Sequence, residues 1–566
     1  MQNSGRTEAT PFWILFICLA VSFVGLVDRD LWTPDEPRDA AISLEMGRTG
    51  DLIIPHLAGT AFVEKPPMYF VVAGYFAQTL GGTFGNTGAI RLSTAAWGIG
   101  TLLMTFFLGR RLMGRDGAIL ATAILATMAG FVINMHWIRV DAALVFFVAA
   151  AVWAFAETYI GGRRWLSLAG GLFTAGAFLS KGVIGPLLIG IAWLGLVAPW
   201  LLSQRGKKID LFLIQHLLGL VLFILPVGYW MLMLRRNGGE QLWHAWYYDN
   251  NFGRFSGTAT ELGHMHSGEP FYYVKSLLIY SLPWLPAVVL WFFTATRDLL
   301  RPRAISPERI FLGIWIVGTV VLLSISVTKR EIYLAPLLPA LALICAEVLA
   351  VEPRRWTRYF FNFWAVIALL ILASSALAPL WVGLLPTSVP ARVAASLHVF
   401  GPRNILAGLC FAACIAALLY RRTALSQAAR IAAITTFLAI GFFAVPARAI
   451  NAEKELGSGT KAFGSRIPQA RRAKVAGWSL SETSRAMLYY YCDWTVPIVA
   501  DEQRLRRIVG GADEEFDSVV LTEESPVSTL LSGVTYKVDA FELVGSANHQ
   551  RTLTLVTSSA ATGREE

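Results

Sequence analysis

"LWTPDEPRDAAISLEMGRTGDLIIPHLAGTAFVEKPPMYF", residues 31–70, places a dense group of charges directly after the first apolar run of the chain. Asp35 and Glu36 follow a Trp-Thr-Pro turn, and Glu64 and Lys65 precede a Pro-Pro break. Charged side chains beside an apolar run are costly to bury and are functional candidates by default. This stretch is therefore the place to look for the chemistry of the protein.

The composition around this stretch is that of a membrane protein. Of the 566 residues, 55% are hydrophobic and 15% are charged, against about 25% charged in soluble domains. The mean hydropathy is +0.54. We predict an all-α membrane domain of about 13 transmembrane helices, since a span needs about 20 apolar residues. The segments lie near residues 11–27, 88–108, 117–134, 141–160, 165–180, 183–202, 211–234, 273–295, 310–327, 333–350, 360–382, 403–420 and 431–449.

Basic residues fall in alternate loops between these segments, which predicts a cytoplasmic N-terminus. Examples are Arg110 and Arg111, and Arg163 and Arg164. The net charge of +10 then reflects membrane topology, and no nucleic-acid partner is expected. We divide the chain into a transmembrane domain, residues 1–450, with interfacial helices at about 36–82, and an outer domain, residues 451–566.

The outer domain has the pattern of a small α/β fold. Five short segments rich in β-branched residues are predicted strands, and two are predicted helices, the first opened by a Ser-Glu-Thr cap. The strands are expected within residues 471–481, 494–502, 516–524, 534–545 and 551–559, and the helices within residues 481–492 and 501–511. Their alternation predicts a small α/β domain on the outer face, with a structural or acceptor-guiding role.

Further charges lie at the ends of the spans on that same outer side. The segment after Pro34 alternates apolar and charged residues, which predicts a short amphipathic helix along the membrane interface. Lys and Arg are the usual partners of phosphate groups, so this set predicts a pocket for an anionic lipid headgroup. Its members at the span ends are Arg139, Asp141, Lys181, Arg254, His264, His266, Lys329, Arg330 and Glu331.

Several motifs occur together in one order. Asp35-Glu36 after "LWTP" is followed by Arg38, "EKPP", "SKG", "NNFGRF" and "KREIYL". On these motifs the chain resembles membrane-embedded GT-C glycosyltransferases of the aminoarabinose-transferase branch. That branch modifies lipid A and is related to protein O-mannosyltransferases. The resemblance covers about residues 10–350, and the later spans and the tail match only in layout.

The resemblance implies a role for particular residues in an inverting transfer from a polyprenyl-phosphate sugar donor. Asp35 matches an aspartate that orients the acceptor or serves as its base. Lys65 and Arg254 match cations that hold the donor phosphate, and Tyr333 matches a tyrosine of the same pocket. The sugar implied is 4-amino-4-deoxy-L-arabinose, the carrier is undecaprenyl phosphate, and the acceptor is lipid A or a related envelope glycan.

A divalent metal (Zn²⁺, Mg²⁺ or Mn²⁺) is also implied. Glu64 matches a residue that binds this metal near the donor phosphate. Family members often carry a histidine where this chain has Asn250 and Asn251, so we expect His266 as the second ligand. The remaining predicted substrate-binding residues are Glu36, Arg38, Arg139, Asp141, Lys181, Lys329 and Arg330.

Each of these assignments has a structural alternative. Glu36 and Arg38 could form a local ion pair, and Arg139 and Asp141 could fix two span ends together. Asp35 could simply cap a helix. A hydroxyl acceptor would need Asp35 as a base, whereas a lipid A phosphate is already a nucleophile, and the sequence does not decide between them.

Other functions would predict different features in the sequence. A related GT-C transferase could place another sugar on another glycan or protein. A flippase for lipid-linked sugars should show charges or broken helices at mid-membrane, and an O-antigen ligase or polymerase should concentrate its function in a large late loop. We expect a multi-pass protein of the bacterial inner membrane, active as a monomer among membrane lipids, with its site on the periplasmic face.

Overall fold

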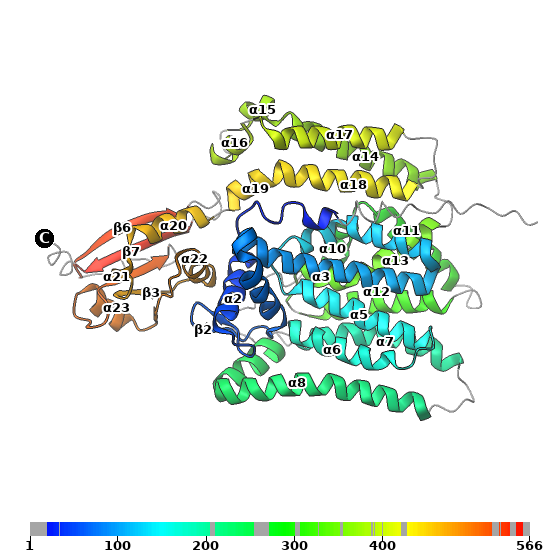
Figure 1. The fold of residues 1–566 in the computed structure, drawn as a ribbon, viewed down its shortest axis with the longest axis horizontal. Coiled ribbons are helices and arrows are strands. Elements are labelled where there is room, and N and C mark those ends of the chain that lie inside the picture. The colour runs from blue at the N-terminus through cyan, green and yellow to red at the C-terminus, as the bar shows by residue number, and fades with distance from the viewer. Residues whose placement is uncertain are drawn as a thin grey trace, which may run out of the picture.

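The computed structural model of the chain describes residues 20–32, 34–203, 210–253, 271–299, 306–326, 328–350, 355–386, 389, 391–398, 400–419, 427–454, 456–522, 531, 534–543 and 551–558. Long apolar helices form one bundle, and a smaller part that contains a sheet lies at one end of it (Figure 1). This agrees with the predicted all-α membrane domain followed by a small α/β region.

The bundle is built from helices between α3 and α18. They run side by side because their surfaces are apolar nearly all round, as in membrane spans. The main ones are α3 (Met68–Thr127), α5 (Asp141–Tyr159), α6 (Leu166–Lys181), α7 (Ile184–Ser203), α8 (Asp210–His244), α10 (Tyr272–Tyr280), α11 (Leu285–Leu299), α12 (Pro307–Ile325), α13 (Leu338–Ala350), α14 (Arg355–Ala376), α17 (Pro402–Leu419) and α18 (Gln427–Ala444).

Shorter elements connect these helices. They are η1 (Val21–Phe23), α4 (Ala129–Met135), the π-helical η2 (Ala245–Gly253), η4 (Glu331–Leu337), α15 (Ala378–Trp381), η5 (Val382–Leu384), α16 (Ala391–His398) and α19 (Pro446–Lys454). The predicted domain boundary near residue 450 falls within α19 and stays a prediction.

In the described residues, eight helices are long and apolar enough to cross a membrane, or nine if the bent pair from Ala428 is one span. The first predicted span, 11–27, lies mostly outside the described residues. Two others, 88–108 and 117–134, lie largely within the single 60-residue helix α3, which has breaks at Gly85 and Gly114. The segment 273–295 is divided between α10 and α11. The exact count of thirteen therefore stays a prediction.

The sheet region confirms the predicted pattern of strands and helices. In the described residues its strands are ordered β4-β3-β5-β7-β6. β3 pairs parallel with β4 and β5, whereas β7 pairs antiparallel with β5 and β6. The strands are β3 (Val475–Trp478), β4 (Ile498–Val499), β5 (Ser518–Thr522), β6 (Tyr536–Leu543) and β7 (Arg551–Ser558).

The helices of this region are α20 (Gly457–Arg466), α21 (Gln469–Arg472), α22 (Glu482–Cys492) and α23 (Glu502–Val509). The Ser481 hydroxyl accepts a hydrogen bond from the Ser484 backbone N–H, which confirms the predicted cap of α22.

Helix α2 (Asp35–Thr49) lies between the sheet region and the bundle (Figure 1). It packs against both α3 and α22, and residues 39–46 are buried on every side. Other parts of the protein therefore cover most of α2, and its expected place along the membrane interface stays a prediction. The predicted apolar piece after it forms a small hairpin of β1 (His56–Leu57) and β2 (Thr60–Ala61).

Two glycines allow α2 and α3 to approach closely. A Cβ atom on Gly74 of α3 would lie 2.6 Å from the Ser43 carbonyl oxygen and 2.8 Å from the Gly47 backbone nitrogen. A Cβ on Gly47 would lie 2.9 Å from the Gly74 carbonyl oxygen. Backbone therefore meets backbone at this crossing, as small residues permit between helices in membranes.

A buried carboxylate fixes the start of α2. The Glu36 side chain has no exposed surface. Arg91 of α3 donates two hydrogen bonds to it, of 3.0 and 2.8 Å, and Arg29 donates two more, of 2.9 and 3.2 Å. The backbone N–H groups of Trp32 and Ile138 complete the set at 2.7 and 3.0 Å. We refer to this arrangement as the Glu36 clamp.

The Glu36 clamp joins four parts of the chain at one point. Besides α2 and α3, it holds the segment before α2 and the segment after α4. Arg91 also donates to the carbonyl oxygens of Leu26, Arg29 and Asp30. Although burial raises the pKa of the Glu36 carboxyl, Arg91 and Arg29 outweigh this effect and lower the pKa to about 2.

Replacing Glu36 by alanine should destabilise the fold strongly. The change leaves two buried guanidinium groups without their carboxylate, which costs about 3–5 kcal/mol. Thermal unfolding of the purified protein in detergent measures this. The difference from the parent protein should shrink as the pH falls from about 4.5 toward about 2, because Glu36 then becomes protonated and loses its charge.

Glu482→Ala is the matched control, because this carboxylate is 52% exposed and pairs with Arg38 at the surface. Its expected cost is at most about 1 kcal/mol. Equal effects of the two substitutions would mean that the Glu36 clamp does not hold the fold.

The glycine contact predicts a second pair of outcomes. Gly74→Ala should destabilise by about 1–3 kcal/mol, because the added methyl group pushes α3 away from α2. Gly190→Ala in α7 has open space at the same atom and should be neutral or stabilising by up to about 1 kcal/mol. Thermal unfolding of both variants tests this, and similar melting temperatures would contradict it.

Candidate functional site

Asp35 begins α2 and is surrounded by arginines. Its carboxylate is 9% exposed, and its Oδ2 lies 2.7 Å from Arg330 Nη2 and 3.1 Å from Arg139 Nη2. Arg38 Nη2 lies 3.8 Å from Oδ1. The helix dipole also favours a negative charge at this position. Two predicted site residues from distant parts of the sequence, Arg139 and Arg330, thus meet Asp35 directly, and Arg38 approaches it from one helical turn away.

The charges around Asp35 determine its protonation. Burial raises the pKa of this carboxyl, but Arg139, Arg330, Arg38 and Lys65 together outweigh burial and lower it to about 2. Asp35 is therefore ionised throughout the physiological pH range. A carboxylate held at so low a pKa is a weak proton acceptor near neutral pH.

Arg38 links Asp35 to the loop before α3. One of its terminal nitrogens lies 3.8 Å from Asp35, and the other lies 4.0 Å from Glu64 Oε2. Its Nε also donates a 3.1 Å hydrogen bond to Asp39. A single guanidinium therefore connects the two ends of the charged stretch, residues 31–70.

Asp141 and Lys181 form a second pair beside this one. Lys181, at the end of α6, donates a hydrogen bond to Asp141 at the start of α5. The Lys181 Nζ also lies 4.4 Å from the centre of the Tyr333 ring, within the range of a cation–π contact. Arg139 thus pairs with Asp35 and Asp141 with Lys181, in place of the predicted alternative in which the two pair together.

A cavity of about 370 Å³ opens next to these groups, and we name it the Lys65 cavity. One part of its wall is polar and the other is formed by aliphatic side chains. The polar residues are Glu64, Lys65, Lys181, Tyr247, Asn250, Ser326, Thr328 and Tyr333. The aliphatic residues are Leu144, Val183, Ile184, Leu187, Leu188, Leu322 and Leu323.

Lys65 stands out within the Lys65 cavity. Among the described residues its ammonium group has no hydrogen-bond or ion-pair partner, although Arg38 and Lys181 lie close enough to repel it. Burial, followed by these two cations, lowers the pKa of Lys65. A part-buried cation without a counter-ion is a strong binding group for an incoming anion.

A second cavity, of about 400 Å³, lies on the other side of the arginines that hold Asp35, and we name it the Arg330 cavity. Arg139 and Arg330 line it, together with Lys275, Glu331, Tyr272 and Tyr280. Three cations against one carboxylate make its wall predominantly positive. Asp35 therefore lies near two cavities, one amphipathic and one basic.

Other predicted site residues lie elsewhere. Glu36 is fully buried, and its carboxylate accepts the hydrogen bonds of the Glu36 clamp. It therefore stabilises the fold, whereas a contact with the substrate was predicted. Lys329 follows α12 and lines neither the Lys65 cavity nor the Arg330 cavity. Arg254 and His266 lie outside the described residues, so their predicted roles stay predictions.

Sequence reasoning missed several residues of this region. Arg91 and Arg29 were not singled out, although Arg91 interrupts the apolar run "GAIRLSTAAW", and a charge within such a run is a signal of a special role. Lys275 follows three aromatic residues, and nothing in its local sequence separates it from an ordinary interfacial lysine.

Metal-ligating side chains (His, Cys, Asp and Glu) do not gather in groups of three or more within the described residues. Glu64 faces Arg38 at 4.0 Å and shares the cavity wall with two lysines, and this positive surrounding opposes a divalent cation. The predicted metal ligand His266 lies outside the described residues.

Curated relatives point to one family. Residues 64–230 match the family described as dolichyl-phosphate-mannose-protein mannosyltransferase. An undecaprenyl phosphate-alpha-4-amino-4-deoxy-L-arabinose arabinosyl transferase of Sodalis glossinidius is 30% identical over 422 residues, which cover 70% of each chain. The chain belongs to this family of arabinosyl transferases. The match to the Aeromonas hydrophila enzyme of the same name is 29% identical and spans 65% of this chain and 66% of that enzyme.

Solved structures confirm the fold expected for this transferase family. The apo crystal structure of ArnT from Cupriavidus metallidurans is 20% identical, has a TM-score of 0.72, and covers 97% of this chain and 98% of that one. The structure of the same protein bound to undecaprenyl phosphate has a TM-score of 0.71 at 19% identity. Together with its apolar helices, this family membership makes the chain an integral membrane protein.

Removal of divalent metals provides a test at this site. Because cations surround Glu64, we expect binding of undecaprenyl phosphate to purified protein to be unchanged after treatment with a chelator. Elemental analysis and a binding titration measure this. A bound metal that is lost in both Glu64→Gln and His266→Ala, together with donor binding, would instead establish the two predicted ligands.

Proposed function

We propose that the protein transfers 4-amino-4-deoxy-L-arabinose from undecaprenyl phosphate to lipid A or a related envelope acceptor, with inversion at the anomeric carbon. The observation that carries this proposal is the Lys65 cavity. One part of its wall contains Lys65, which has no described ion-pair partner, together with Lys181 and Tyr333, and the other part is aliphatic. The buried Asp35 lies close enough to Lys65 to interact with its charge. A polyprenyl phosphate has the same division into a charged head and an apolar tail.

The donor phosphate fits the polar part of the Lys65 cavity. Lys65 supplies a positive charge with no described partner, and Lys181 lies over Tyr333 on the same wall. The first isoprene units would then lie along the aliphatic residues. The solved ArnT of Cupriavidus metallidurans is bound to undecaprenyl phosphate, which supports this carrier as the lipid of the donor.

The reaction needs stabilisation of the leaving group above all. Negative charge grows on the phosphate oxygen as the bond to the sugar breaks. Fixed cations aimed at such an oxygen commonly supply the largest part of catalysis. Lys65 is suited to this role because its charge is not already neutralised, whereas the charge of Lys181 is shared with Asp141.

Asp35 is better suited to organising the arginines than to taking a proton. With a pKa of about 2, it would activate a hydroxyl poorly. This favours an acceptor that is already an anionic nucleophile, such as a lipid A phosphate. Arg139 and Arg330 line the Arg330 cavity while they hold Asp35, so an acceptor phosphate bound there would approach from beside Asp35.

The membrane orientation proposed is a cytoplasmic N-terminus and a periplasmic site in the bacterial inner membrane. The charges at the two ends of α5 support it. Asp141 at its start belongs to the site, whereas Glu157 near its end pairs with Arg111 and Arg163 from loops predicted to be cytoplasmic. We expect the protein to act as a monomer.

Transfer and lipid movement are distinguishable in one experiment. Purified protein should convert lipid A to its aminoarabinose-modified form in detergent when given undecaprenyl phosphate-linked sugar, as measured by mass spectrometry. A flippase would give no product there and would instead move labelled donor across liposome membranes. Product with a different sugar or acceptor would indicate a related transferase.

Asp35→Asn should lower kcat/KM by about 100-fold or more, the magnitude expected for loss of a preorganised charge. Without the carboxylate, the three arginines repel one another and leave their positions. Transfer assays and thermal unfolding measure activity and folding separately. Asp493→Asn is a suitable control, because this carboxylate is 77% exposed and pairs only with Arg48 at the surface. If Asp35→Asn retained most of the activity, the role of Asp35 would be limited to capping a helix.

The lowered pKa of Lys65 predicts the alkaline side of the pH profile. Since kcat/KM reports the free enzyme, activity should fall as Lys65 loses its proton, at a pH below the ordinary range for lysine. Lys65→Arg should keep its charge to much higher pH and shift this loss upward, even if its maximum rate is lower. Identical alkaline limbs for the two proteins would remove Lys65 from the donor site.

A further inference from the structure

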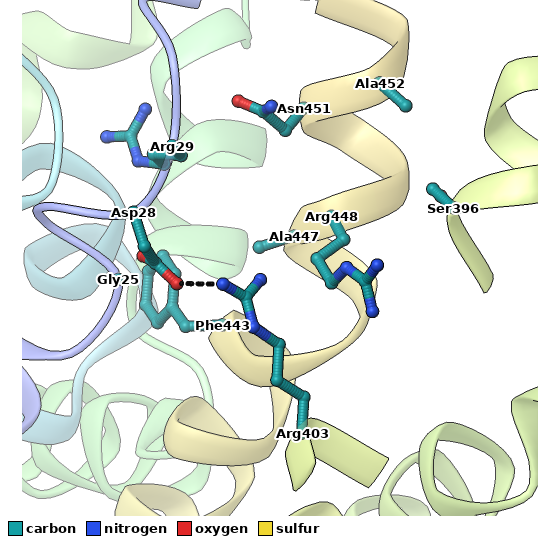
Figure 2. A pocket seen from close by; sticks show the side chains of 10 residues that line it. All are labelled: Gly25, Asp28, Arg29, Ser396, Arg403, Phe443, Ala447, Arg448, Asn451 and Ala452. Carbon is teal, nitrogen blue, oxygen red and sulfur yellow. Dashed lines mark ion pairs between the residues drawn. The ribbon is translucent and has the colours of Figure 1, made fainter. Parts of the chain in front are cut away.

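A third cavity, of about 220 Å³, lies outside the site described above, and we name it the Arg403 cavity. It is bounded by the segment that precedes α2 and by the helices α16, α17, α18 and α19 (Figure 2). None of its lining residues belongs to the Lys65 cavity or the Arg330 cavity. They are Gly25, Asp28, Arg29, Ser396, Arg403, Phe443, Ala447, Arg448, Asn451 and Ala452.

Two arginines, Arg403 and Arg448, line the Arg403 cavity. Figure 2 shows the side chains of Arg403 and Arg448 next to each other on the same side of the cavity, and their positive charges repel. Arg403 lies 3.0 Å from Asp28, in a pair of which both members are roughly half exposed. The Arg448 guanidinium has no partner among the described residues.

Arg29 does not add a free charge to this cavity. Its guanidinium turns away from Arg403 in Figure 2 and is neutralised by Glu36 in the Glu36 clamp. The groups that remain are Arg403, Arg448 and Asp28, which together leave one positive charge unbalanced.

Both arginines occupy positions that helices normally reserve for acidic residues. Arg403 is the second residue of α17, and Arg448 is the third residue of α19. The first turn of a helix carries a partial positive charge, so each arginine is electrostatically unfavourable there by itself. An anion near the two would offset the repulsion between these side chains.

Asn451 adds a neutral donor to the wall. Its side-chain oxygen accepts hydrogen bonds from the Asp30 backbone N–H, at 2.8 Å, and from the Trp32 indole, at 3.0 Å. These bonds fix the orientation of the amide, which lines the cavity. A positive pair with one oriented N–H donor is the set of groups that a phosphate oxygen requires.

We propose that the Arg403 cavity binds a phosphate group, supplied either by an anionic lipid headgroup or by free phosphate. Arg448 is the principal cation, Arg403 the second, and Asp28 an internal competitor that occupies Arg403 when the phosphate is absent. The bound group connects the segment before α2 to α17 and α19. Because that segment carries Arg29 of the Glu36 clamp, phosphate binding stabilises the fold at a distance from the transfer site.

Opposite effects of two kinds of variant test this proposal. Binding of inorganic phosphate and of short-chain phosphatidylglycerol to the full-length protein in detergent is measured by calorimetry, and stabilisation by thermal unfolding. Arg448→Gln should weaken binding about tenfold or more, as expected for loss of a charge-assisted hydrogen bond. Asp28→Asn should strengthen it, because Arg403 is then released. Arg235→Gln, which removes an exposed arginine of α8 paired with Glu240, should leave binding unchanged.

A further variant distinguishes binding at the Arg403 cavity from binding at the donor site around Lys65. Lys65→Ala should lose donor binding but keep phosphate binding at the Arg403 cavity, so failure of the proposed transfer would not affect this result. Binding of phosphatidylglycerol without inorganic phosphate would identify a lipid headgroup, and binding of both would identify the phosphate group itself. Unchanged affinity in Arg448→Gln and Asp28→Asn, with both variants folded, would overturn the proposal.

Discussion

The six hydrogen bonds to the Glu36 carboxylate are the constraint on which the rest of the structure depends. Desolvating a carboxylate completely is expensive, and only two guanidinium groups and two backbone donors in the right places make it stable. These donors come from three parts of the chain, and Glu36 itself belongs to a fourth. The start of α2 can therefore take one position only, and Asp35, the neighbouring residue, is presented to Arg139 and Arg330 from there.

The balance of charge distinguishes the residues that stabilise this region from the residue that is available to bind a ligand. The Glu36 and Asp35 carboxylates are each paired with arginines, so they organise the region. Lys65 is the opposite case, a cation that has no hydrogen-bond or ion-pair partner among the described residues, although Arg38 and Lys181 repel it and Asp39 and Asp141 attract it. The structure thus keeps its compensated charges in the frame and its uncompensated charge on a cavity wall. This division is what allows one small volume to contain so many ionised groups.

Much of this arrangement could be predicted from the sequence. The strands and helices after residue 470 follow ordinary patterns with polar boundaries, and local pattern is sufficient there. Asp35, Lys65 and Lys181 were identifiable because charges at the ends of apolar segments are rare. The burial of Glu36 was not predictable, because its partner Arg91 lies 55 residues away and sequence spacing contains no information about that meeting. The contact of α2 with α22 was not predictable for the same reason, since an amphipathic pattern does not show which part of the protein covers a helix.

The crossing of α2 and α3 at Gly47 and Gly74 affects how the sequence can change over time. Where two helices meet through side chains, each exchange of a core residue shifts their relative position. Here backbone atoms set the separation, so aliphatic residues elsewhere in the bundle can be exchanged without moving Asp35 relative to Lys65. Relatives that share only about a third of their residues can then retain one placement of these charges, provided that the two small positions stay small.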